Sequence, residues 1–143
     1  MIELYQYIIT PIAGVLLAQS MKRILARASN DKTRVKFAGM GGFPSAHTAG
    51  ITSVTFLILL NEGLSGAVSG LALATSVVII YDALNLRRSA GDLALIVLAL
   101  QKETEKNRIT RKRIARLKGH TPLEVAGGIL VGFIVAITLK LLV

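Results

Sequence analysis

The sequence of 143 residues contains no cysteine and no tryptophan, and only 17% of its residues are charged. The missing cysteines exclude disulfide bonds, thiolate metal ligands and cysteine nucleophiles. With 52% hydrophobic residues and a mean hydropathy of +0.61, the chain is too apolar for a soluble domain or for intrinsic disorder as its main state. Its length accommodates a single domain, residues 1–143. Positive charge is in excess: 17 Lys and Arg oppose 8 Asp and Glu, a formal net charge of +9.

Four long charge-free runs predict membrane-spanning helices. A span needs about 20 mainly apolar residues, and these runs are apolar around the whole helix, without the one-sided stripe of a soluble amphipathic helix. The predicted fold class is therefore all-α, an integral membrane bundle of about four transmembrane helices. We expect the spans at about residues 4–26, 45–61, 64–84 and 121–142.

A shorter apolar run precedes the last span. Residues 93–101 would form a helix only roughly 14 Å long, about half the thickness of the hydrocarbon core. They continue into the basic stretch 102–118. We therefore expect an interfacial amphipathic helix at about 90–117, and a shallow re-entrant helix is the alternative for 93–101.

The positions of the cations predict which side faces the cytoplasm. When the four spans are threaded, the loops 22–44 and 82–120 fall on one side and contain 16 of the 17 Lys and Arg residues, while Lys140 alone lies on the other side. Positively charged loops stay in the cytoplasm. We therefore expect a multi-pass protein of the cytoplasmic (inner) membrane, with the loops in the cytoplasm and both termini outward.

The basic stretch 102–118 is a candidate contact for nucleic acid or for lipid. It contains no aromatic residue on which a base would stack, and its charges alternate with Ile109, Ile114 and Leu117. Attraction to anionic lipid head groups explains such a stretch more simply. We expect anionic head groups as partners and no nucleic acid.

Three short polar segments fall on the cytoplasmic side: residues 41–47, 82–88 and 119–124. The only two histidines, His47 and His120, lie in the first and the last of them. Each histidine lies at the start of a helix that is expected to enter the membrane. At such a helix start, free backbone N–H groups and the helix dipole attract anions. Independent helix caps have no reason to collect both histidines on one side, so this gathering favours a site for a phosphate group.

Glycine and cations complete this candidate site. Gly42 lets the backbone approach an anion closely, and Lys22, Arg87 and Arg88 supply positive charge at the same depth. Phosphoryl transfer through a histidine needs these groups, because one imidazole attacks phosphorus, the other protonates the leaving alkoxide, and the cations hold the oxygens.

Glu124 has two interpretations. It lies four residues after His120 on the same helix face, so its carboxylate can bond one imidazole nitrogen and leave the other to attack. Alternatively, Thr121 and Glu124 form a capping box with Pro122 at the first helical position, and the local pattern alone favours this cap. Ser45 is likewise a candidate N-cap of the second span.

The motifs resemble those of a known family. Residues 41–47 read Gly-Gly-Phe-Pro-Ser-Ala-His, residues 81–91 contain Tyr-Asp-Ala, Arg88 and Ala-Gly, and residues 119–125 read Gly-His-Thr-Pro-Leu-Glu-Val. In this order and spacing they resemble the divergent branch of the type 2 phosphatidic acid phosphatase superfamily, which is related to acid phosphatases and vanadium-dependent haloperoxidases. The resemblance covers nearly the whole chain. It implies dephosphorylation through a phosphohistidine, without metal or cofactor, on a helical bundle.

The resemblance also implies roles for the histidine motifs. Pro-Ser-Ala-His at 44–47 resembles the superfamily's Pro-Ser-Gly-His, which makes His47 the general acid and Ser45 a phosphate ligand. His120-x-x-x-Glu124 resembles its His-x-x-x-Asp, which makes His120 the nucleophile and Glu124 its partner. In the two motifs, Ala replaces Gly and Glu replaces Asp.

The cations match the superfamily less closely. Arg87 or Arg88 corresponds to the Arg upstream of the nucleophile, although the pair lies about thirty residues before His120 and the superfamily has only a few residues there. Lys22 is the nearest match to the Lys of the first motif. The Arg-Pro of that motif is missing here, so three other cations are rivals of Lys22 for this role: Arg27, Arg34 and Lys36.

These features predict a membrane lipid-phosphate phosphatase that opens at the cytoplasmic leaflet. Phosphatidylglycerophosphate is the first choice of substrate, because this lipid is made on that face, followed by polyprenyl phosphates and phosphatidic acid. The altered motif spacing favours an alternative, a non-catalytic lipid-binding module that retains the fold.

Two further interpretations concern metal and assembly. A metal-dependent site would use Asp82, Asp92 and Glu124, but carboxylates this scattered are more typical of caps and ion pairs. We therefore expect no metal and give Asp82 a supporting role, for example in an ion pair with a neighbouring Arg. The motif Gly128-x-x-x-Gly132 is typical of helix packing and favours contacts within the monomer, with a homo-oligomer as the alternative.

Overall fold

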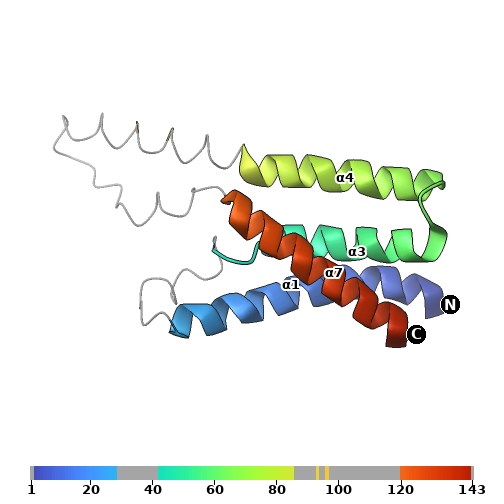
Figure 1. Cartoon of the computed structure of the whole chain (residues 1–143), viewed down its shortest axis with the longest axis horizontal. Coiled ribbons are helices and arrows are strands. Elements are labelled where there is room, and N and C mark those ends of the chain that lie inside the picture. The colour runs from blue at the N-terminus through green and yellow to red at the C-terminus, as the bar shows by residue number, and fades with distance from the viewer. Residues whose placement is uncertain (1, 29–41, 86–92, 94–95, 97–119, 143) are drawn as a thin grey trace.

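The computed structural model describes residues 2–28, 42–85, 93, 96 and 120–142. This part of the chain forms four α-helices and contains no β-strand (Figure 1), which confirms the predicted all-α class. The helices are α1 (Ile2–Ala28), α3 (Ala46–Glu62), α4 (Ala67–Leu84) and α7 (Pro122–Leu142).

Three of these helices are long and apolar enough to cross a membrane: Leu4–Ala28, Ala67–Leu84 and Pro122–Leu142. They coincide with the predicted first, third and fourth spans. Helix α3 has 17 residues and is roughly 26 Å long, slightly short of the hydrocarbon core, so its place as the second span stays a prediction. The expected interfacial helix at 90–117 lies almost wholly outside the described residues, as does its re-entrant alternative.

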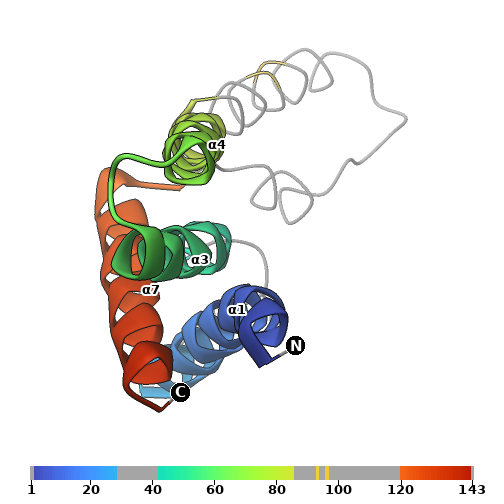
Figure 2. The ribbon, with the colours of Figure 1, turned by 90° about the vertical axis from the view of Figure 1, so that its right-hand side faces the viewer.

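Helix α3 occupies the centre of the bundle and contacts each of the other three helices. Helix α7 crosses α3 and α1 obliquely (Figure 1), and α1 and α4 lie on opposite sides of α3 (Figure 2). Helix α4 is the most peripheral, because only Ser69, Ser76 and Ala83 are buried on it. Large apolar side chains such as Leu71 are exposed on its outer surface, as expected for a helix that faces lipid.

Helix α1 packs through a stripe that repeats every fourth residue. An α-helix has about 3.6 residues per turn, so side chains four residues apart form one line along the helix, and this line faces the bundle. A Cβ added at Gly14 would lie 2.7 Å from the carbonyl oxygen of Ala49, so only glycine allows α1 and α3 to approach this closely. The buried stripe consists of Thr10, Gly14, Ala18, Lys22 and Ala26.

The Gly128-x-x-x-Gly132 motif packs α7 against α3. A Cβ at Gly128 would lie 2.6 Å from the carbonyl oxygen of Ser45, and one at Gly132 would lie 2.1 Å from Oγ1 of Thr52. Both glycines are buried. The motif therefore serves packing within the monomer, the interpretation that the sequence favoured.

Buried hydroxyl groups also join the helices. Oγ1 of Thr55 on α3 lies 2.7 Å from Oγ of Ser76 on α4, whereas Oγ1 of Thr52 bonds within α3, to the carbonyl oxygen of Thr48 over 2.7 Å. Such pairing removes the cost of an unsatisfied polar group in an apolar interior. The polar side chains of α3 therefore fit its central position.

The helix ends gather in two groups. The chain termini and the α3–α4 connection lie at one end, where Asn61 donates to the hydroxyl of Tyr7 over 3.0 Å and accepts from Lys140. The end of α1, the start of α3, the end of α4 and the start of α7 lie at the other (Figure 1). This up-and-down order agrees with the predicted threading. The side of the membrane that each end faces stays a prediction.

Candidate active site

Ser45 begins α3 as its N-cap. Its buried Oγ accepts from the backbone N–H of Thr48 over 3.4 Å and from Oγ1 of Thr48 over 2.9 Å, which confirms the capping interpretation. Because Oγ is the acceptor in both contacts, the Ser45 hydroxyl hydrogen is left to donate. The preceding Phe43–Pro44 peptide bond is cis, and Gly42 has a φ of 88°, a left-handed conformation that favours glycine.

Main-chain hydrogen bonds join the starts of α3 and α7. The N–H of Ser45 donates to the carbonyl oxygen of Glu124 over 2.8 Å, and the N–H of His120 donates to the carbonyl oxygen of Ala83 over 3.2 Å. These bonds connect three helices at one end of the bundle. They bring together the two histidine-containing segments that are more than 70 residues apart in sequence, His47 and His120.

His120 and Glu124 form a close pair at the start of α7. Nδ1 of His120 lies 3.0 Å from Oε2 of Glu124, and His120 is 6% exposed. A carboxylate on Nδ1 favours the tautomer with hydrogen on that nitrogen, which leaves the lone pair on Nε2. The geometry is therefore that of an oriented imidazole.

The same carboxylate also completes a capping box. Oε2 of Glu124 accepts from the N–H of Thr121 over 3.0 Å, and the N–H of Glu124 donates to Oγ1 of Thr121 over 3.3 Å. Pro122 is the first residue of the helix. The two interpretations of Glu124 left open by the sequence are thus compatible, because one oxygen serves both the cap and the imidazole.

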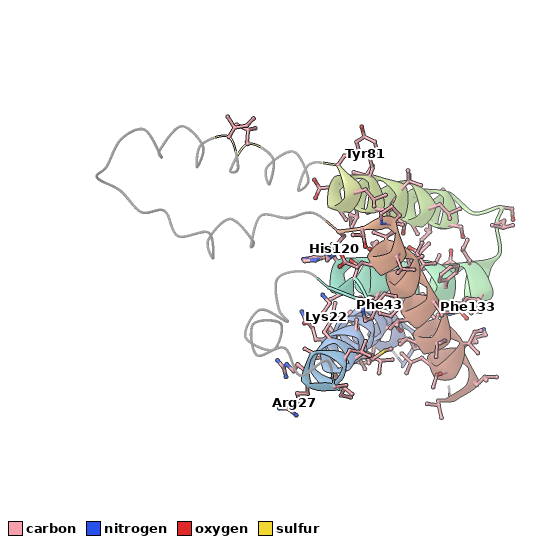
Figure 3. The ribbon with its side chains drawn as sticks, turned by 60° about the vertical axis from the view of Figure 1, so that its left-hand side comes forward. Lys22, Arg27, Phe43, Tyr81, His120 and Phe133 are labelled. Carbon is pink, nitrogen blue, oxygen red and sulfur yellow. The ribbon has the colours of Figure 1, made fainter. Side chains whose placement is uncertain are left out.

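Lys22 is the cation that the fold places on a packing face. It is 5% exposed and belongs to the buried stripe of α1, whereas Arg23 and Arg27 are exposed. Figure 3 shows Lys22 and His120 at the same end of the bundle. Burial of a lysine is costly unless its charge is compensated, so this position sets Lys22 apart from its rival Arg27. The other two rivals, Arg34 and Lys36, lie outside the described residues.

The remaining predicted residues fall at this end or outside the described part. His47 is exposed in the first turn of α3, and Asp82 is half-buried in the last turn of α4. Arg87, Arg88 and Asp92 lie outside the described residues. Within the described ranges, no group of three or more His, Asp or Glu side chains is placed to hold a metal ion.

Two features of the site escaped sequence reasoning. The carbonyl oxygen of Ala83 holds the backbone of His120, and a main-chain acceptor leaves no signal in the sequence. The ring of Phe43 lies over Gly127, where an added Cβ would come within 2.2 Å of the ring. The small residue one turn after Glu124 was the only available hint of this contact.

These features define a class: an all-helical, apolar protein with a histidine–carboxylate pair where two helices begin. The family model described as "Divergent PAP2 family" matches residues 5–135. The chain therefore belongs to the divergent PAP2 family, as its three motifs had predicted. A similar protein is "Uncharacterized membrane protein YuiD" of Bacillus subtilis (strain 168), 26% identical over 149 residues that cover 92% of each chain. No solved structure matches.

Proposed function

We propose that the chain is a multi-pass membrane phosphatase that hydrolyses a lipid phosphomonoester through a phosphohistidine. The observation that carries the proposal is the 3.0 Å contact between Nδ1 of His120 and Glu124, beside the start of α3 and at the same end as the buried Lys22. Membership of the divergent PAP2 family supports a phosphatase-like site. The three apolar helices support a membrane location.

The proposed reaction has two displacements. In the first, Nε2 of His120 attacks phosphorus, the ester P–O bond breaks, and His47 gives its proton to the leaving alkoxide. In the second, water attacks the phosphohistidine while His47 takes its proton, and the N–P bond breaks to release phosphate. Glu124 stabilises the positive charge on His120 in both steps. The net reaction consumes one water and restores both histidines.

Lys22, the Ser45 hydroxyl, the backbone at Gly42 and one or both of Arg87 and Arg88 would hold the phosphoryl oxygens. Fixed donors are effective there because charge builds on these oxygens in the transition state. No metal is required in this scheme.

The proposed substrate is phosphatidylglycerophosphate, and polyprenyl phosphates and phosphatidic acid are the alternatives. The choice depends on the cytoplasmic orientation predicted from the cations. Anionic head groups would contact the exposed Arg23 and Arg27 near the end of α1, because basic residues next to a span attract anionic lipid.

One observation favours a second candidate, a lipid-binding module without catalysis. Apart from the contact between Glu124 and His120, the hydrogen bonds of Ser45 and Glu124 contribute to helix caps and helix packing, so they would be useful to the fold even without turnover. Such a protein would bind a lipid phosphate and release no product.

Phosphate release from the purified protein separates the two candidates. In detergent with a chelator present, we expect the wild type to release phosphate from at least one of the three lipid classes. His120→Gln, which keeps a polar side chain of similar size, should release none. Lipid binding without release by the wild type would support the non-catalytic module, and full activity of His120→Gln would contradict the phosphohistidine.

A further inference from the structure

Phe43 is an exposed aromatic residue two positions before Ser45, the residue that bonds to Glu124, and it has no role in the proposed reaction. It is 41% exposed, although the main chain just after it is held. Two residues later, the N–H of Ser45 bonds to Glu124. The ring is therefore presented from the loop that starts α3, next to the helix that carries the His120–Glu124 pair.

The Phe43 ring packs against Gly127. An added Cβ at Gly127 would lie 2.2, 2.6 and 2.9 Å from three atoms of the Phe43 ring. No real side chain tolerates such distances, so the ring lies where it does only because residue 127 is glycine. By contrast, a Cβ at Gly70 on α4 would meet nothing within 4 Å.

The depth of the ring identifies what it can contact. Gly127 lies one turn beyond Glu124 on the same face of α7, roughly 5 Å further along the helix axis. Since α7 enters the apolar layer from the end where His120 lies, the ring is on the lipid side of the phosphate position. In phosphatidic acid, one of the proposed substrates, that level holds the glycerol and the first acyl carbons. An exposed aromatic face suits this apolar part of the substrate and not the phosphate itself.

We propose that Phe43, seated on Gly127, is a specificity-determining residue that contacts the glycerol–acyl part of the substrate and so selects lipid over water-soluble phosphomonoesters. The inference rests on the proposed function and extends it from the phosphate to the apolar part of the same ligand. Phe43 would touch substrate, and Gly127 would act as a positioning residue through the ring.

The test compares phosphatidic acid with glycerol 3-phosphate, which is the same phosphomonoester without acyl chains. For Phe43→Ala we expect KM for the lipid to rise about five- to tenfold, because an apolar contact is lost, with kcat nearly unchanged. KM for glycerol 3-phosphate should rise much less, because this substrate lacks the acyl carbons, and thermal unfolding in detergent checks that the variant is folded. Phe43→Leu should recover most of the affinity.

A double-mutant cycle tests the contact between Phe43 and Gly127. Gly127→Ala should reproduce the rise in KM, because its Cβ displaces the ring, and the double variant Phe43→Ala/Gly127→Ala should be no worse than either single one. Gly70→Ala is the matched control and should resemble the wild type. Equal losses on both substrates, or additive effects of the two substitutions, would overturn the inference and leave the proposed function intact. A wild type that releases no phosphate from any of the three proposed lipid classes would overturn both.

Discussion

The backbone N–H of Ser45 donates a 2.8 Å hydrogen bond to the carbonyl oxygen of Glu124, so the motif that contains His47 is fixed to the last residue of the motif that begins with His120. Glu124 also contacts the imidazole of His120 through its carboxylate. One residue thus sets the position of the α3 start and the orientation of the candidate nucleophile. The two helix starts form a single unit.

Glu124→Gln should abolish most of the phosphatase activity while preserving the fold. Glutamine retains an oxygen that can accept from the N–H of Thr121, but it lacks the charge that stabilises the cationic, phosphorylated imidazole. We expect kcat to fall about 10³-fold or more, as for a neutral replacement of the acid in a Ser-His-Asp triad. Glu62→Gln, an exposed residue at the other end of the bundle, is the control. Near-normal turnover by Glu124→Gln would assign the carboxylate to the helix cap alone.

Lys22→Met should reduce phosphate release without unfolding the protein. Methionine fills much of the same space on the buried stripe of α1 but removes the charge, so stabilisation of the phosphoryl oxygens is lost. We expect kcat/KM to fall about 10²-fold, whereas Arg27→Met on the exposed face should have little effect. Equal losses in the two variants would show that the α1 cations act only by attracting anionic lipid.

Gly132→Ala should destabilise the bundle. The added Cβ would lie 2.1 Å from Oγ1 of Thr52 and 2.8 Å from the N–H nitrogen of Ser53, so α3 and α7 would have to separate. The cost should be about 1–3 kcal/mol, measured as a lower midpoint of thermal unfolding in detergent. Gly70→Ala introduces the same methyl group into open space and should be neutral or slightly stabilising. A similar midpoint for both variants would contradict the tight α3–α7 contact.

The predicted orientation is open to a cysteine-labelling test, since the chain contains no cysteine and single-cysteine variants need no prior substitution. Ser65→Cys lies in the α3–α4 connection, and Arg27→Cys lies at the opposite end. In intact cells, an impermeant maleimide should label Ser65→Cys at once and Arg27→Cys only after permeabilisation. The reverse pattern would invert the topology and place the site on the outer side.

The helix positions were predictable because charge is excluded from lipid-facing helices. The expected spans at 64–84 and 121–142 differ from α4 and α7 by only a few residues at either end. The capping pattern around Thr121 was predictable as well, since a capping box depends on residues within one turn.

Long-range contacts and the rotation of the helices were not predictable. The bond from Ser45 to Glu124 joins main-chain atoms, which every residue possesses, so no side-chain pattern marks it. The burial of Lys22 was hidden for another reason: a helix that is apolar all round gives no sign of which face packs inward. Sequence alone made Lys22 the nearest match but left Arg27 as a rival, and the stripe of small residues on α1 separates them.

Trapping of the covalent intermediate tests the phosphohistidine most directly. The purified protein would be mixed with phosphatidylglycerophosphate labelled with ³²P in its phosphomonoester, quenched in alkali within the first turnovers, and digested for peptide mapping. The proposed mechanism predicts a label that is stable in alkali, labile in acid and confined to His120, and no label on His120→Gln. Turnover without any labelled protein, or a label that persists in His120→Gln, would contradict it.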